Sequence, residues 1–101
     1  MNGGRFSKQR LRACLEQDQY RLHPDCWKRL RELSIDLNDT LHVLRNGIIH
    51  AEPEFDAKLG QWRFTLQGET VDQKALAIIF TFIEVDGVLV LTIANEGLRE
   101  P

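Results

Sequence analysis

The chain has 101 residues, of which 43% are hydrophobic and 28% charged, and its formal net charge is −2. This size and composition predict one globular domain spanning residues 1–101, and the longest apolar run, residues 75–83, is too short to cross a bilayer. Because no apolar segment of a signal peptide follows the basic start, we expect a cytoplasmic protein without a membrane partner. Cys14 and Cys26 lack C-x-x-C spacing, so we expect neither a disulfide framework nor a zinc site. His23 and Cys26 could supply two metal ligands, but two more are missing. We expect no cofactor.

The charge is divided unevenly along the chain. Residues 1–50 hold nine Lys/Arg against six Asp/Glu, whereas residues 51–101 hold four against nine. A positive N-terminal half permits an anionic partner there. The sequence pI of about 5.9 nevertheless lies below the range typical of nucleic-acid-binding domains. Charge alone therefore leaves both nucleic acid and protein partners open.

Residues 1–19 are predicted to contain a basic N-terminal helix. Ser7 can cap this helix, and Leu11, Cys14 and Leu15 recur at helical spacing on one side. The other side is basic, since the first twelve residues hold four cations and no anion. Such a face can attract a phosphate backbone, dock on an acidic partner segment, or simply be solvated. The four cations are Arg5, Lys8, Arg10 and Arg12.

A pair of helices is predicted within residues 20–47, after the extended stretch "YRLH". Pro24 suits the first position of the earlier helix, because its missing N–H would be unpaired there anyway. Asp36 can cap the later helix, and Asn46-Gly47 is predicted to end it in the left-handed conformation.

The later helix also carries a candidate anion site. His42 and Arg45 lie one turn apart on it, away from the leucine stripe, and could bind an anion near the helix end. Cations at a helix C-terminus also interact favourably with the helix dipole, which is the commoner role.

Residues 48–95 are predicted to form an antiparallel sheet, because the hydrophobic period changes from 3.6 to 2 after the last helix. Asp86-Gly87 between two apolar runs predicts a hairpin with a type I′ turn. Residues 96–101 are expected to be a tail. The predicted fold is therefore α+β, with two to three N-terminal helices packed on a three- to four-stranded antiparallel sheet.

The predicted hairpin register places Val85 opposite Val88 and puts Phe80 and Phe82 on the core face. The opposite face is fairly apolar, so we expect the N-terminal helix or a partner chain to cover part of it. This second face is a candidate surface for a homodimer or for a partner peptide. Its candidate interface residues are Ile79, Ile83, Val88 and Val90.

Three stretches carry a family resemblance: "KRLRELSIDLNDTLHVLRNGII", "GQWRFTLQG" and "ALAIIF…VLVLTIA". Arg29 matches a helix arginine of the family pattern, Asn46-Gly47 matches its helix end, and Arg63 matches the arginine of its strand. Over about residues 20–95 the chain resembles a small bacterial domain-of-unknown-function family grouped with the RelE/ParE toxin superfamily. The resemblance implies a RelE-like arrangement of helices and sheet.

Members of that superfamily include mRNA-cleaving toxins, ribosome-dependent or free, and gyrase poisons. The resemblance therefore implies RNA binding or metal-independent mRNA cleavage in a toxin–antitoxin context. RNA, the ribosome and an antitoxin protein would be the partners. RNA cleavage needs a base, an acid and a cation that stabilises the phosphate. The candidate catalytic residues are Arg63, Arg29 and His23.

Each of these candidates also has a structural interpretation. Arg63 can lie on the less buried sheet face with its head in water, and Arg29 can belong to a solvated helix face. His23 can belong to the N-cap region before Pro24. The rival hypothesis is a non-catalytic interaction module that acts as a homodimer or through a partner peptide, so the sequence leaves enzymatic activity open.

Overall fold

The structure of the protein is a computed structural model that describes residues 3–50, 52–58 and 60–99, apart from the side chains of residues 3–7 and 95–97. Its helices are α1 (Gly3–Glu16), α2 (Pro24–Leu33) and α3 (Leu37–Asn46). Its strands are β1 (Tyr20–Leu22), β2 (Ile48–Ile49), β3 (Glu54–Asp56), β4 (Gln61–Glu69), β5 (Ala75–Val85) and β6 (Val88–Arg99). Among these described segments, no helix is long and apolar enough to cross a membrane.

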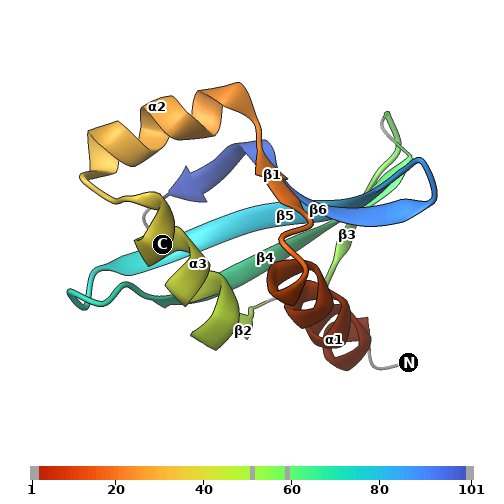
Figure 1. Cartoon of the computed structure of the whole chain (residues 1–101), viewed down its shortest axis with the longest axis horizontal. Coiled ribbons are helices and arrows are strands. Elements are labelled where there is room, and N and C mark those ends of the chain that lie inside the picture. Colours follow the sequence, from red (N-terminus) through yellow and green to blue (C-terminus); the bar gives the residue numbers. More distant parts are fainter. Residues whose placement is uncertain (1–2, 51, 59, 100–101) are drawn as a thin grey trace.

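The strands lie in the order β1-β6-β5-β4-β2, and β3 pairs with the N-terminal part of β4 (Figure 1). β1 runs parallel to β6, whereas the other pairs are antiparallel. The prediction of a three- to four-stranded antiparallel sheet is therefore wrong, because the described part of the chain forms six strands with mixed directions. β1, β2 and β3 each span only two or three residues, too few to show strand alternation in the sequence. The parallel pairing of Tyr20 with Leu91 joins distant residues, which no local signal specifies.

Two of the predicted helix starts are confirmed and one is wrong. Pro24 lies in the first turn of α2, and Asp36 caps α3 in a capping box with Asp39. α1 begins at Gly3, so Ser7 lies inside this helix and does not cap it. The glycines at the start of α1 are weak helix formers, which hides its first turn from a prediction based on propensity.

Gly47 ends α3 without the left-handed conformation that its sequence context predicts. Its φ is −74° and its ψ is 175°, so that prediction is wrong. Glycine is required there for space, because a Cβ atom would lie 2.4 Å from Leu66 Cδ2 and 2.6 Å from Val43 O. The close approach of α3 to β4 therefore explains this glycine.

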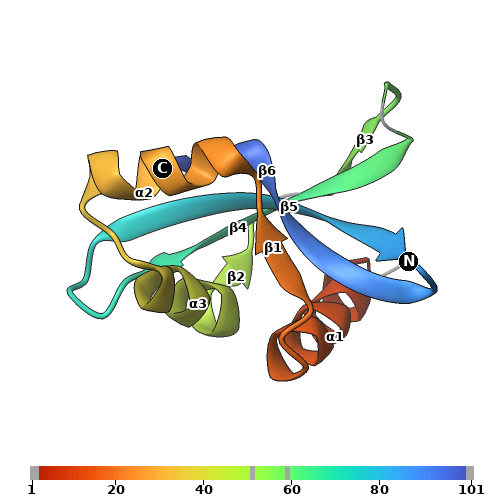
Figure 2. The ribbon, with the colours of Figure 1, turned by 45° about the horizontal axis from the view of Figure 1, so that its top comes forward.

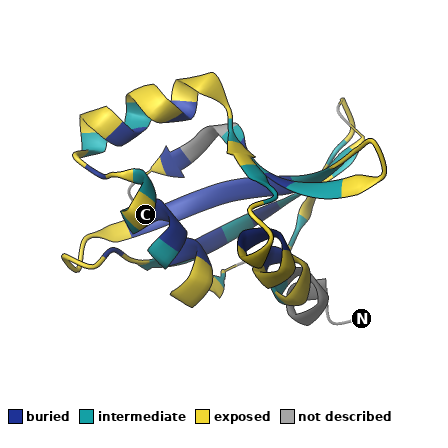
Figure 3. Ribbon diagram, in the orientation of Figure 1, coloured by how far each residue is buried: buried dark blue, intermediate teal, exposed yellow. Residues whose placement is uncertain are grey.

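The three helices share a single hydrophobic core with β4, β5 and β6. Figure 3 shows the buried residues of the helices on their inner sides and the exposed residues on their outer sides. Phe80 lies in the middle of the core, where its ring stacks on Phe64 at 5.5 Å and meets Phe82 edge-on at 5.6 Å. The opposite sheet face has buried side chains along the middle of β5, namely Ala77, Ile79 and Thr81.

Cys14 packs beneath β6, where its thiol donates to the carbonyl of Leu89 at 3.6 Å. Burial raises the pKa of Cys14. The unfolded chain therefore loses this proton at a lower pH than the folded protein does, and stability is expected to fall as the pH rises above about 9. Thermal unfolding from pH 7 to 10 tests this: Cys14→Ala should flatten the decline, and an unchanged slope in that variant would refute the assignment.

The β5–β6 hairpin has the predicted turn and register. Asp86 and Gly87 have φ angles of 51° and 81°, as a type I′ turn requires. Val85 pairs with Val88, which confirms the predicted register. After an irregularity in the pairing with β5, β6 continues to Arg99, so the sheet includes part of the segment 96–101 that the sequence suggests is a tail.

Candidate functional site

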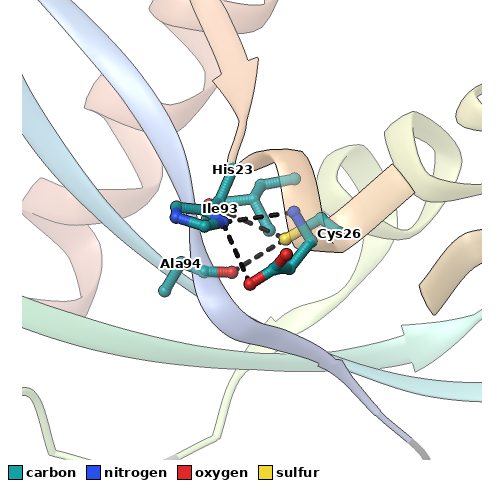
Figure 4. A network of polar contacts seen from close by, with 5 residues as sticks. His23, Cys26, Ile93 and Ala94 are labelled. Carbon is teal, nitrogen blue, oxygen red and sulfur yellow. Dashed lines mark hydrogen bonds and ion pairs between the residues drawn. The ribbon is translucent and has the colours of Figure 1, made fainter. Parts of the chain in front are cut away.

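His23 lies between β1 and α2 and caps that helix. Its Nδ1 atom accepts a hydrogen bond from the backbone N–H of Asp25 at 3.2 Å, and the Asp25 carboxylate lies 3.8 Å away. Figure 4 shows this corner beside β6, where the Cys26 thiol donates to Ala94 O at 2.8 Å. The backbone N–H of His23 donates to Ile93 O at 3.2 Å. These contacts start α2 and fasten it to β6.

Arg29 is the second predicted catalytic residue, and it links α2 to the end of β6. Its Nε atom donates to Leu98 O at 3.1 Å, while Nη1 donates to Glu32 at 3.0 Å. The guanidinium thus has a backbone partner on the sheet and a carboxylate partner on its own helix. Both contacts favour a structural role for this arginine.

Arg63 lies on β4, in the part of the strand that pairs with β3. Its Nη1 atom is 4.0 Å from the Asp56 carboxylate, and Glu54 is its cross-strand partner. β5 and β6 separate β4 from the corner that holds His23 and Arg29. The structure therefore does not bring the three predicted catalytic residues together.

Lys8 connects α1 to α3, because its ammonium group donates to the carbonyl of Gly47. Burial, and secondarily the nearby Arg12, lower the pKa of Lys8. Among the described side chains, no carboxylate forms an ion pair with Lys8 or Arg12. We refer to these two residues as the α1 cation pair.

The other predicted anion-binding residues lie around α1 and α3. Arg10 is exposed on α1, and the side chain of Arg5 lies outside the described ones. Arg45 is exposed in the last turn of α3, where it complements the helix dipole. The ring of His42 lies one turn earlier, 3.4 Å from the side-chain amide of Asn46. His42 and Arg45 thus share the C-terminal half of α3, the helix whose end Lys8 contacts.

The predicted interface residues on the second sheet face differ in exposure. Ile79 is buried, with an exposed fraction of 7%. Ile83 and Val90 form a half-buried cross-strand pair. Val88 is exposed beside the hairpin turn. The accessible apolar part of this set therefore lies toward the tip of the β5–β6 hairpin.

A shallow pocket of about 370 Å³ lies beside β2, and its walls include His50, Gln67 and Glu69. None of these side chains is buried. In the described part of the chain, no group of three or more His, Cys, Asp or Glu side chains could hold a metal ion. These features are typical of a surface depression and not of a formed ligand site.

An exposed aromatic pair projects from the sheet, and sequence reasoning did not identify either residue as part of a candidate site. Phe55 on β3 pairs with Trp62 on β4, and their rings meet edge-on at 5.2 Å. Their exposed fractions are 52% and 53%. Trp62 shares a strand face with the buried Phe64, so the pair extends the core face beyond the covered region. Phe55 lies on a strand of only three residues, too few to show alternation in the sequence; its lone aromatic ring was the available signal.

The sheet divides next to this pair. The ladder between β4 and β5 ends at the pair Phe64–Phe80, and the carbonyl of Trp62 accepts a hydrogen bond from the Thr81 hydroxyl at 2.7 Å. β4 pairs with β3 beyond that point, while β5 continues with β6. Figure 2 shows the β3–β4 hairpin and the β5–β6 hairpin separating from each other. We call residues 54–63 and 81–92 the diverging hairpins.

Thr81→Val is expected to destabilise the protein by about 1 kcal/mol, because it leaves the part-buried carbonyl of Trp62 without its hydroxyl donor. Urea unfolding of the variant measures this cost. Thr92→Val is the matched control, since Thr92 lies opposite Thr81 but accepts its bond from the exposed Arg21. An equal and small loss of unfolding free energy in both variants would show that the bond from Thr81 to the Trp62 carbonyl does not stabilise the protein.

Acidic residues predominate on and beside the diverging hairpins. The acids outnumber the bases five to two between residues 52 and 63 and between residues 81 and 92. Such a surface attracts cationic partners and repels a nucleic-acid backbone. The acids are Glu52, Glu54, Asp56, Glu84 and Asp86, and the bases are Lys58 and Arg63.

Comparison of the chain with protein families, with curated proteins and with solved structures finds no match. The RelE/ParE resemblance therefore stays a prediction based on short stretches of sequence. The function has to be inferred from the arrangement of the residues themselves.

Proposed function

We propose that this protein is an interaction module that binds a partner polypeptide through the diverging hairpins. The exposed pair of Phe55 and Trp62 carries the proposal. Aromatic side chains contribute strongly to binding when a partner covers them, and tryptophan is among the residues enriched at binding hot spots. Because the two rings already pack on each other, docking a partner restricts them little further.

The contacts of the predicted catalytic residues support a non-catalytic role. Arg29 bridges α2 and β6, His23 caps α2, and Arg63 lies beside the carboxylate of Asp56. A substrate phosphate would have to compete with these contacts. The aromatic pair, in contrast, becomes available without breaking any bond of the core.

A photo-crosslinking amino acid in place of Lys58 tests this proposal in the cells that produce the protein. Lys58 is exposed beside β3 and leaves both aromatic residues intact. We expect one discrete adduct with a polypeptide, which disappears when Phe55 and Trp62 are both changed to serine. The melting temperature of the double variant should stay close to that of the parent, because both rings are half exposed.

The same crosslinker in place of Asp72 serves as the control, since this exposed residue lies in the turn between β4 and β5. We expect no such adduct from this position. An adduct that forms equally at both positions, or that survives in the double serine variant, would contradict the proposed function.

RNA binding through the α1 cation pair is a second candidate, which one observation favours. Burial and the neighbouring Arg12 lower the pKa of Lys8, so an anion bound between the two cations would offset their repulsion. In a RelE-like, toxin–antitoxin setting this anion would be the backbone of RNA, free or on the ribosome. An antitoxin protein would then be a further partner.

Titration with labelled single-stranded RNA in EDTA, at low and at physiological salt, tests this second candidate. We expect salt-sensitive binding that Arg12→Gln weakens severalfold. Arg31→Gln, at an exposed position of α2, should leave binding unchanged. Metal-independent cleavage that is lost in Arg63→Ala would extend the candidate to RelE-like catalysis. Absence of binding at low salt would exclude free RNA as the ligand.

A further inference from the structure

Among the described residues, the edge of β5 that faces β4 has no ladder partner along the second half of the strand. Phe64–Phe80 is the last pair of the β4–β5 ladder in the part of the chain that the structure describes. The next outward carbonyl of β4, that of Trp62, accepts the Thr81 hydroxyl instead of a backbone donor from β5. Figure 2 shows that the hairpins separate beyond this point.

The alternation of an antiparallel ladder determines which backbone groups lie on that edge. In a two-residue hairpin the flanking residues, here Val85 and Val88, exchange both hydrogen bonds. Ile83 therefore also directs its N–H and C=O toward β6. Phe82 and Glu84 direct theirs away from β6, toward the gap between the hairpins. Each presents one donor and one acceptor at the spacing of a strand.

The side chains beside this edge suit an extended segment with apolar residues at alternate positions. Phe82 is half-buried, and its ring meets Phe64 edge-on at 5.7 Å. Trp62 continues the same face on β4 and is exposed. A strand lying along β5 would place every second side chain on this aromatic face.

Charge indicates which kind of segment fits the gap. Glu84 and Asp86 make the β5–β6 hairpin acidic, since residues 81–92 hold no Lys or Arg. On the other hairpin, two acids are balanced by the two bases Lys58 and Arg63. A second copy of this chain that paired its own β5 here would bring acidic residues against acidic residues, which is unfavourable. A basic segment would instead be attracted by the acidic β5–β6 hairpin, beside which it would lie.

We infer that an extended, basic segment of a partner polypeptide adds to β5 as a strand, pairing with Phe82 and Glu84 between the diverging hairpins. The inference rests on the proposed function, because it specifies the partner and the binding mode of the same surface. In strand addition the main-chain hydrogen bonds supply affinity and the alternate side chains supply specificity. The apolar side chains of the segment pack on Trp62, while its cationic side chains meet Glu84 and Asp86 of the β5–β6 hairpin.

A short peptide of alternating lysine and valine residues is the probe for this inference. It is titrated into the isotope-labelled protein, and the backbone amide signals are followed by NMR. We expect the amides of Phe82 and Glu84 to shift and to gain protection from hydrogen exchange. The amide of Asp72, in the turn before β5, should not respond.

Two matched peptides separate the contribution of side-chain charge to binding from that of the main-chain hydrogen bonds. A peptide with glutamate in place of lysine tests the sign of the charge and should not bind. A lysine–valine peptide with N-methylated backbone keeps the side chains but loses the donors of the strand, and should bind about tenfold more weakly. Glu84→Gln in the protein should weaken the unmodified peptide about threefold at low salt, whereas Asp72→Asn should not.

Failure of the inference can be told apart from failure of the proposed function. If the lysine–valine peptide does not bind, or if the N-methylated peptide binds equally well, strand addition is overturned. The proposed interaction surface is still supported in that case if the adduct at position 58 requires Phe55 and Trp62. An adduct at position 58 that does not depend on Phe55 and Trp62 overturns the proposed function, and the inference falls with it.

Discussion

Gly47→Ala is expected to destabilise the protein by about 3 kcal/mol, the upper part of the usual range for overpacking. The added Cβ atom would lie 2.4 Å from Leu66 Cδ2 and 2.6 Å from Val43 O. The carbonyl of Gln67 would lie at 2.7 Å. Two of these neighbours are backbone atoms, which cannot rotate away. To relieve this steric clash, the end of α3 has to move away from β4. That movement would open the core and disturb the hydrogen bond from Lys8 to the Gly47 carbonyl.

Gly60→Ala is the control for the Gly47 variant. Gly60 has a φ of +65°, and a Cβ atom there would meet nothing within 4 Å. Its substitution should cost only about 1 kcal/mol, through backbone conformation alone. Urea unfolding of both variants measures the difference. If Gly47→Ala proved as stable as Gly60→Ala, α3 would not pack against β4 as closely as the structure indicates.

Phe80→Ala should cost about 3–5 kcal/mol of unfolding free energy. Phe80 is fully buried at the centre of β5. It contacts the rings of Phe64 and Phe82, so its removal leaves a cavity between neighbours that the sheet holds in place. Chemical denaturation or calorimetry measures the loss, and in a domain of this size much of the total stability would disappear.

Phe55→Ala is the matched comparison for Phe80→Ala. Phe55 is half exposed and contacts Trp62 at the edge of the fold, so its removal should cost less than about 1 kcal/mol. The pair of variants separates a phenylalanine that holds the fold from one that is available to a partner. A loss of stability in Phe55→Ala as large as that in Phe80→Ala would mean that the aromatic pair is structural.

The elements that the sequence predicts well are those with a local signal. Pro24 and Asp36 mark the starts of α2 and α3 through chemistry confined to a few residues. Asp86-Gly87 likewise determines the turn and thereby the register of β5 with β6. Each of these signals acts within a single turn of backbone, and at these three places the tertiary contacts agree with the local signal.

The elements that the sequence does not predict depend on distant residues. β1 is a strand because Tyr20–Leu22 docks parallel to β6, and β3 is a strand because β4 leaves β5 to pair with it. Gly47 is needed for the packing of α3 on β4, although its sequence context resembles a left-handed cap. Local propensity carries no information about such contacts.

In the candidate site, too, the residue types were predictable from local sequence but their contacts with distant residues were not. The sequence marks Arg63 and Arg29 as cations in suitable elements, but only the fold shows their carboxylate and carbonyl partners. The fold also shows Phe55 beside Trp62. This contact could not be predicted, because residues 54–56 form a strand only through their pairing with β4. Side-chain contacts across elements were therefore the part that sequence patterns could not supply.

The tryptophan emission of a Trp27→Phe variant, titrated with the polypeptide identified from the adduct at position 58, tests the central claim most directly. In this variant Trp62 is the remaining tryptophan, and it is half exposed in the free protein. Covering its ring with a partner should move the emission to shorter wavelength and saturate with binding. Emission that stays unchanged while the partner saturates the protein would show that the partner binds elsewhere, and would contradict the assignment of the diverging hairpins as the binding surface.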